Sequence, residues 1–103
     1  MKLALYYEGN KYEKICKLPI IECDTIENGT EYIVNHLKNN FNEMIGKLGD
    51  SEFIHFTICK KEKNYEKKYY QSKWNYKLLY TGRIYSPDKC MIFDETAGEW
   101  SNV

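Results

Sequence analysis

The amino-acid sequence predicts an α+β domain in which one amphipathic helix packs on one face of a mostly antiparallel sheet. Three observations support this prediction. Short segments that alternate apolar and polar residues lie near both ends of the chain, as in half-buried strands. One central segment repeats apolar residues at spacings of three and four, as in a helix with one buried face. Turn residues separate neighbouring strand candidates by short connections, which suit antiparallel pairing.

The amino-terminal quarter predicts three strands. Alternation over residues 3–8 indicates the first strand. The Gly-Asn pair at 9–10 is a two-residue hairpin signal, so residues 11–17 form the returning strand. Pro19 interrupts this strand because proline has no N–H to donate, and residues 20–24 form a third, shorter strand.

The helix follows. Thr30 can cap its first turn through the side-chain hydroxyl, and Glu31 sits favourably near its positive end. Gly49 supplies the left-handed residue that ends it. Its apolar stripe has no partner except the sheet, so we expect the helix to cover one sheet face. The stripe consists of Ile33, Val34, Leu37, Phe41, Met44, Ile45 and Leu48.

The remaining strands follow the helix. Residues 53–60 alternate as one strand, and residues 78–85 form another that we expect to bend at Gly82. Residues 86–89, Ser-Pro-Asp-Lys, are typical of a type I turn, and residues 90–94 return as the last strand. The expected order is therefore β-β-β-α-β-β-β.

The chain is expected to form one domain over residues 1–103, with a loose tail over 95–103 apart from Trp100. A length of 103 residues allows a single core. The aromatic fraction of 16% argues against disorder, which is typical of chains with few aromatic residues.

Location follows from what the sequence lacks. No apolar run approaches the roughly 20 residues that span a bilayer, and the first residues do not read as a signal peptide. We therefore expect a cytoplasmic protein without membrane contact. Its four cysteines show no C-x-x-C pair and are interpreted as reduced thiols. Fourteen lysines stand against one arginine, and isoleucine, asparagine and tyrosine are abundant, which is the amino-acid usage of an AT-rich genome.

Residues 60–77 are the most distinctive segment of the sequence. They carry seven lysines against two glutamates, a local charge of +5 in a chain whose net charge is zero. Tyrosine and tryptophan alternate with these lysines, as on surfaces that hold phosphates and bases or grip an acidic protein patch. The segment lies between two strands and predicts either a long hairpin arm or a short helix with a loop.

An acidic region balances the charge of this basic segment. Residues 18–52 carry seven acidic side chains against two lysines, a local charge of −5. The acidic face that we expect from this region consists of Glu22, Asp24, Glu27 and Glu31. Such a face can mimic the phosphates of a nucleic acid and block a basic groove, while the lysine-rich segment binds elsewhere.

Catalytic patterns are weak. Asp50 precedes the Glu66-x-Lys68 pair, and an acidic residue followed by E-x-K is the pattern of metal-dependent restriction-type nucleases. His55 and Cys59 share one strand face but lie about 13 Å apart at ~3.3 Å per residue, too far for one zinc ion. No glycine-rich phosphate loop is present, and we predict no catalytic residue, no metal site and no cofactor.

The sequence therefore favours a small, non-enzymatic binding protein that inhibits or modulates a larger protein. In general type, though not by any motif, such a chain is similar to phage-borne inhibitors and immunity proteins. That type implies a partner that handles nucleic acid, such as a defence nuclease of the host. The alternative is direct binding of a nucleic acid or nucleotide through residues 60–77, and the outlier is the nuclease. The predicted partner-binding residues are Lys67, Lys68, Tyr69, Tyr70, Lys73, Trp74 and Tyr76.

Overall fold

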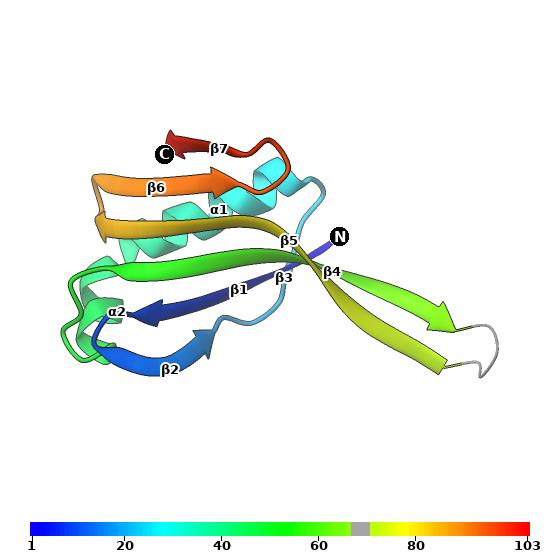
Figure 1. The fold of residues 1–103 in the computed structure, drawn as a ribbon, viewed down its shortest axis with the longest axis horizontal. Coiled ribbons are helices and arrows are strands. Elements are labelled where there is room, and N and C mark those ends of the chain that lie inside the picture. The colour runs from blue at the N-terminus through cyan, green and yellow to red at the C-terminus, as the bar shows by residue number, and fades with distance from the viewer. Residues whose placement is uncertain (67–70) are drawn as a thin grey trace.

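The computed structural model describes the backbone of residues 1–66 and 71–103 (Figure 1). The side chains of residues 12–13, 63–66 and 71–75 lie outside the description as well. Along the described chain the elements are β1 (Lys2–Gly9), β2 (Tyr12–Lys17), β3 (Ile21–Glu22), α1 (Ile26–Asn39), α2 (Phe41–Lys47), β4 (Ile54–Glu66), β5 (Gln71–Ser86), β6 (Lys89–Asp94) and β7 (Glu99–Asn102).

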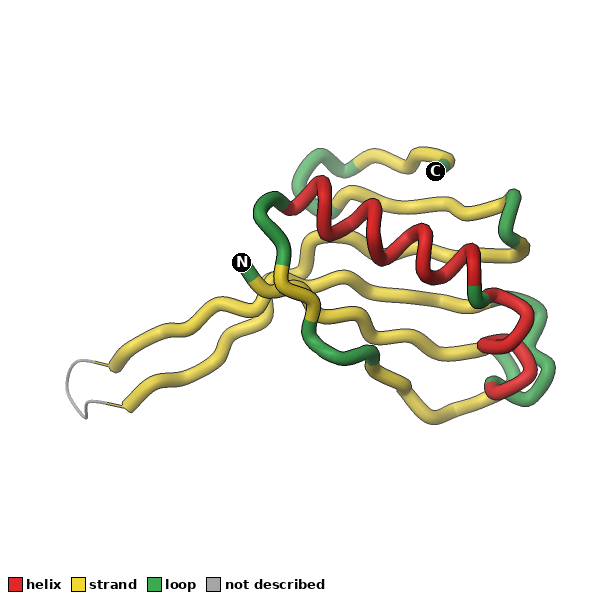
Figure 2. The backbone as a smooth tube through the Cα atoms, turned by 180° about the vertical axis from the view of Figure 1, so that it is seen from behind, coloured by secondary structure: helices red, strands yellow, loops and turns green. Residues whose placement is uncertain are grey.

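The strands form one sheet in the order β2-β1-β4-β5-β6-β7, with β3 pairing beside β1. Every pairing is antiparallel. Both helices lie on the same side of this sheet, with α1 running across it behind the strands (Figures 1 and 2). The α+β class and the antiparallel sheet predicted from the sequence are confirmed.

The core lies between the sheet and the two helices. It contains the alternating apolar residues of the central strands, such as Leu3 and Leu5 of β1 and Phe56 of β4, which have no exposed surface. The whole helical stripe predicted from the sequence packs against them, with only Ile45 half-buried. Burial of this stripe is what a helix of mixed polarity needs in order to be stable.

The helical segment differs from the prediction at its start and in its middle. It begins at Ile26 rather than near Thr30, because the side-chain oxygen of Thr25 accepts a hydrogen bond of 3.1 Å from the backbone N–H of Asn28. At Asn40 the helix divides into two, and the Asn40 amide donates to the carbonyl oxygen of His36 at 2.9 Å. The predicted end is confirmed, since Gly49 has a φ of 68°.

The carboxyl-terminal segment is ordered, contrary to the expectation of a loose tail. Residues 95–98 form a turn in which the carboxylate of Asp94 accepts backbone hydrogen bonds from Thr96 at 2.9 Å and Ala97 at 3.1 Å. The chain then returns as β7 and pairs with β6. The rings of Phe93 and Trp100 pack 5.2 Å apart across this pair, which gives the short strand a long-range contact.

The register of β5 changes near Leu79 rather than at Gly82, where the bend was expected. Ile58 of β4 pairs with Tyr80 and Cys59 pairs with Leu78, which leaves Leu79 as the extra residue of a bulge. Leu79 is buried and belongs to the core. Gly82 has another role, because the ring of Phe56 lies directly over it.

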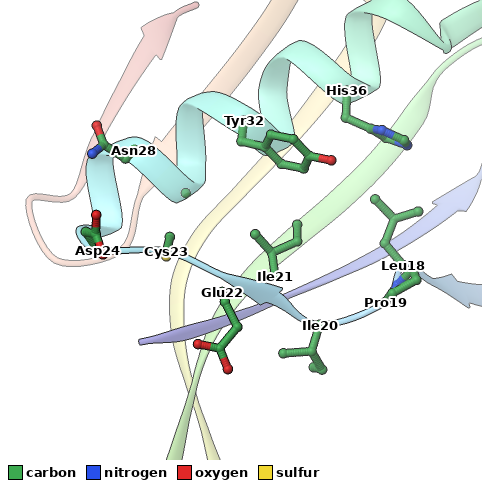
Figure 3. A pocket seen from close by; sticks show the side chains of 11 residues that line it. Leu18, Pro19, Ile20, Ile21, Glu22, Cys23, Asp24, Asn28, Tyr32 and His36 are labelled. Atoms are coloured by element: carbon green, nitrogen blue, oxygen red, sulfur yellow. The ribbon is translucent and has the colours of Figure 1, made fainter.

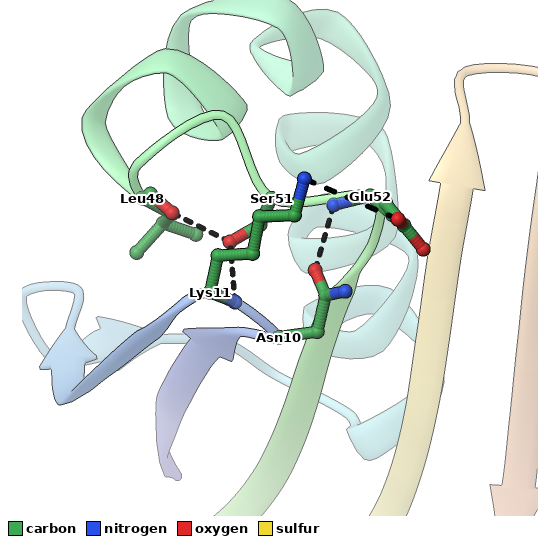
Figure 4. A network of polar contacts seen from close by, with 5 residues as sticks. All are labelled: Asn10, Lys11, Leu48, Ser51 and Glu52. Carbon is green, nitrogen blue, oxygen red and sulfur yellow. Dashed lines mark hydrogen bonds and ion pairs between the residues drawn. The ribbon is translucent and has the colours of Figure 1, made fainter.

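A polar network ties the β1–β2 turn to the loop before β4 (Figure 4). The hydroxyl of Ser51, which is buried, accepts from the backbone N–H of Lys11 at 3.1 Å and donates to the carbonyl oxygen of Leu48. The side-chain oxygen of Asn10 accepts from the backbone N–H of Glu52 at 2.6 Å. These bonds hold the loop that delivers the chain from α2 to the central strand.

Gly82→Ala is expected to lower the free energy of unfolding by about 1–3 kcal/mol, because a Cβ forces overpacking of the core. That atom would lie 2.4 Å from the carbonyl oxygen of Met91 and 2.4 Å from the ring of Phe56. Gly46→Ala is the matched control, since a Cβ at position 46 meets nothing within 4 Å. This substitution also replaces a glycine inside helix α2 with a better helix former. Urea unfolding should show the control unchanged or more stable by about 0.5–1 kcal/mol. Equal stability of the two variants would contradict the packing of Phe56 on Gly82.

Candidate functional site

The face of the sheet opposite the helices has no covering layer in the described part of the chain (Figures 1 and 2). Strand alternation places aromatic and charged side chains on it, where a core-facing strand would place aliphatic ones. We call this surface the open face. Its main residues are Tyr6, Glu8, Ile15, Lys17, His55, Cys59, Tyr76, Leu78, Thr81, Arg83, Tyr85, Met91, Phe93 and Trp100.

Aromatic rings meet in pairs over the open face. Three pairs have ring centroids 6.1 Å apart for Tyr6–Tyr76, 5.3 Å for Phe53–Tyr85 and 5.2 Å for Phe93–Trp100. None of the three is a parallel stack, because their ring planes meet at 76°, 42° and 51°. The rings thus pack edge-on or tilted against each other, which is a favourable geometry for exposed aromatic pairs.

Lysine or arginine side chains lie over rings of the Tyr6–Tyr76 pair and the Phe53–Tyr85 pair. The cation-to-centroid distances are 5.1 Å for Arg83 over Phe53, 5.1 Å for Lys89 over Tyr85 and 5.8 Å for Lys17 over Tyr6. A cation within about 6 Å of a ring face is attracted by the π-electrons. A nucleic-acid base would have to displace such a cation before it could stack on the same side of the ring.

The centre of the open face is a packed, neutral patch. Burial raises the pKa of the Tyr6 phenol, and a hydrogen bond with Tyr76 raises it further. Cys59 is 8% exposed although it points away from the helices, and burial raises the pKa of its thiol. Both groups are therefore uncharged at neutral pH, and Cys59 is a poor nucleophile.

The predicted basic segment is a hairpin arm over its described residues, which decides between the two conformations left open by the sequence. Pairing continues from Lys60–Lys77 to Glu66–Gln71, and the arm projects beyond the rest of the sheet (Figure 1). Tyr76 lies at the base of the arm, is 44% exposed and contacts Tyr6. The arm is thus continuous with the open face.

Of the seven predicted partner-binding residues, only Tyr76 has a side chain within the described part of the chain. Lys67, Lys68, Tyr69 and Tyr70 lie outside the described residues. Lys73 and Trp74 lie in β5 opposite Asn64 and Lys63, and their side chains also lie outside the description.

All four predicted acidic residues are exposed. Asp24, Glu27 and Glu31 lie at or on α1, whereas Glu22 of β3 pairs opposite Lys2 and so shares the sheet face that points away from the core. Glu22 and Asp24 border a groove of about 660 Å³ between the segment 18–24 and α1 (Figure 3). Glu27 and Glu31 border a second groove, between α1 and the strands β5 to β7. The four carboxylates therefore do not converge on one site.

The groove in Figure 3 is mainly apolar. Ile21 and Leu18 lie on one side of it, and Tyr32 and His36 of α1 lie on the other. Glu22 at its rim forms an ion pair of 3.6 Å with Lys2. Nothing in this groove brings a nucleophile and a base together among the described side chains.

The proposed nuclease residues are separated by the fold. Asp50 lies in the loop before β4, whereas Glu66 is the last residue of that strand. The twelve residue steps from Ile54 to Glu66 span about 40 Å in an extended strand, so the backbone positions of Asp50 and Glu66 lie at opposite ends of β4. Among the described residues, no three metal-ligating side chains come together, and no helix is long and apolar enough to cross a membrane.

The sequence did not predict that Arg83, His55 and Trp100 share one surface. The signal for His55 was present, because it alternates with core residues along its strand. No such signal existed for the other two residues. The position of Arg83 depends on the register of β5, and the position of Trp100 depends on the pairing of β7 with β6.

Tyr76→Ala is expected to expose Cys59 and speed its alkylation by iodoacetamide at pH 8 by roughly three- to tenfold. Removal of the ring uncovers the thiol, and its pKa falls toward the ordinary value, so the thiolate fraction rises. Mass spectrometry of the digested protein separates Cys59 from the other thiols. Trp100→Ala is the control, because Trp100 lies at the edge of the same face. If both variants speed the alkylation of Cys59 equally, the idea that Tyr76 shields this thiol is contradicted.

Comparison of the chain with protein-family models, with curated proteins and with solved structures finds no match.

Proposed function

We propose that this protein is a non-enzymatic binding protein that holds a larger protein through the open face and the adjoining arm. The observation that carries the proposal is an uncovered sheet face rich in the residues that anchor protein interfaces. Tyrosine, tryptophan, arginine and methionine are enriched in such interfaces, and the open face contains all four. Binding by this surface would inhibit or modulate the partner by covering part of it.

Exposure supports this use of the surface. Trp100 is 56% exposed, Tyr76 44% and Leu78 41%, and these side chains spread from β7 across to the base of the arm. Large apolar side chains gathered on one face of a small protein favour a contact surface over a solvated one. The rings of Tyr76 and Trp100 already pack against Tyr6 and Phe93, so little side-chain entropy is lost when they bind a partner.

The charges favour a partner with an acidic patch. The open face and its edges carry Lys17, Arg83 and Lys89, against Glu8 and Glu95. The exposed carboxylates of Glu27 and Glu31 lie on the other side of the sheet, on α1. This separation would orient the protein as it approaches a partner of complementary charge.

The more specific form of the proposal is an inhibitor of a protein that handles nucleic acid, of the kind carried by phages or mobile elements. The acidic helix side could then meet a basic nucleic-acid groove while the open face holds a second surface. The four free thiols fit a cytoplasmic site of action.

A protein partner is favoured over a nucleic acid by the cations that lie over the rings. Base stacking requires a free ring face, and three of the rings carry a lysine or arginine of the protein itself. Direct nucleic-acid binding through the arm remains the alternative that the following experiment separates.

Capture from a lysate of the host should retain the partner on the wild-type protein and lose it on Trp100→Ala. Loss of one exposed aromatic anchor is expected to weaken binding by about 30-fold, corresponding to ~2 kcal/mol. Tyr32→Ala is the matched control, since Tyr32 is 59% exposed but lies on the helix side. The captured protein is then assayed with and without the wild-type chain, and we expect its activity to change.

Three results would contradict the proposal. The first is the absence of any captured protein, and the second is loss with Tyr32→Ala but not with Trp100→Ala. The third is a salt-sensitive gel shift of labelled single-stranded DNA at ~50 mM salt by the protein alone, which would favour the alternative.

A further inference from the structure

A shallow cup of about 420 Å³ lies within the open face. Arg83 of β5 occupies its centre, with His55 of β4 directly opposite on one side and Met91 of β6 on the other. Tyr85 and Trp100 also line it, so four adjacent strands contribute to the cup. Side chains on paired strands hold their relative positions better than side chains on loops do.

Arg83 is the only arginine of the chain. Its guanidinium lies 5.1 Å from the ring centre of Phe53, and that ring packs at 5.3 Å against Tyr85. Among the described residues Arg83 forms no ion pair with a carboxylate. The cup thus contains a positioned fork of N–H donors whose charge no described acidic side chain neutralises.

Two other groups of the cup can donate hydrogen bonds, the Tyr85 hydroxyl and the Trp100 indole N–H. The Thr81 hydroxyl is already used, because it donates to the carboxylate of Glu95 at 3.2 Å. At the rim, the Nδ1 atom of His55 faces the carboxylate of Glu8 at 3.7 Å.

The carboxylates of Glu8 and Glu95 flank the cup and limit what it can accept. A single planar carboxylate can meet the guanidinium between them. A run of phosphodiesters carries one negative charge per nucleotide and would bring further charges toward these two acids. The surroundings therefore favour one carboxylate over a nucleic-acid backbone.

We propose that this cup is a carboxylate subsite that receives an aspartate or glutamate side chain of the protein partner. The proposal rests on the proposed function, since it names the chemistry of the partner surface that meets the open face. In the bound state the carboxylate oxygens accept from the Arg83 guanidinium, and the Trp100 ring closes one side of the contact.

The composition of the chain makes the test direct. A single arginine gives a single side-chain Nε–Hε signal in the ¹⁵N spectrum, and two tryptophans give two indole signals, of which Trp100→Phe identifies one. Titration of the isolated protein with a capped tetraglutamate peptide should shift the Arg83 and Trp100 signals saturably. A capped tetraglutamine peptide should shift neither.

Two variants separate the cup from general charge attraction. Arg83→Lys keeps the charge but loses the fork, and should weaken peptide binding, followed at the Trp100 indole, by about tenfold. Lys17→Gln removes one charge from the same face outside the cup, and should leave the affinity within about twofold.

The subsite is overturned if the Arg83 signal does not respond to tetraglutamate, or if Arg83→Lys binds as tightly as the wild type. It is also overturned if oligothymidylate of matched charge binds more tightly than the peptide. Because this titration uses the isolated chain and small probes, its result does not depend on capture of a partner. A negative titration with intact capture removes the subsite alone.

Discussion

The structure depends on a constraint of coverage: α1 and α2 form one layer, and one layer buries only one face of a sheet. The helical stripe and the strand residues that face it make a mainly aliphatic core that also contains Phe41 and Phe56. The other face must remain compatible with water while still protecting the small residues at its centre. Tyr6, Tyr76 and Leu78 do so beside Ala4 and Cys59, which are 0% and 8% exposed although they face away from α1 and α2.

This second, thinner layer explains why the open face is aromatic and cationic. A tyrosine ring covers its neighbours and keeps a hydroxyl in water, and a lysine or arginine stem lies along a ring and keeps its charge in water. The same properties make good contact residues. The residues that shield the open face from water are therefore of the same kinds as those that we propose for binding.

The sequence predicts those parts of the fold that local patterns encode. The helical stripe and the strand alternation were correct because each is a repeated choice between a buried and an exposed position. The helix start was wrong because Thr25 and Thr30 offer the same capping chemistry. Gly29 decides between them, since a Cβ there would lie 2.5 Å from Leu3 and 2.6 Å from the Cys23 sulfur, so this glycine serves helix–sheet packing rather than a turn. The strand β7 was missed because its pairing depends on the contact between Trp100 and Phe93, which no local pattern reveals.

The candidate site was less predictable than the fold because one inserted residue determines it. Strict alternation from Arg83 and Thr81 would place Leu79 on the open face and bury Leu78. The bulge instead turns Leu79 into the core and places Leu78 and Tyr76 beside Cys59 and Tyr6. The exposed apolar side chains at the base of the arm thereby join the surface that carries Arg83 and Trp100. A bulge leaves no clear mark in the sequence, so the sequence suggests the basic arm as a contact region but does not predict the surface that the arm extends.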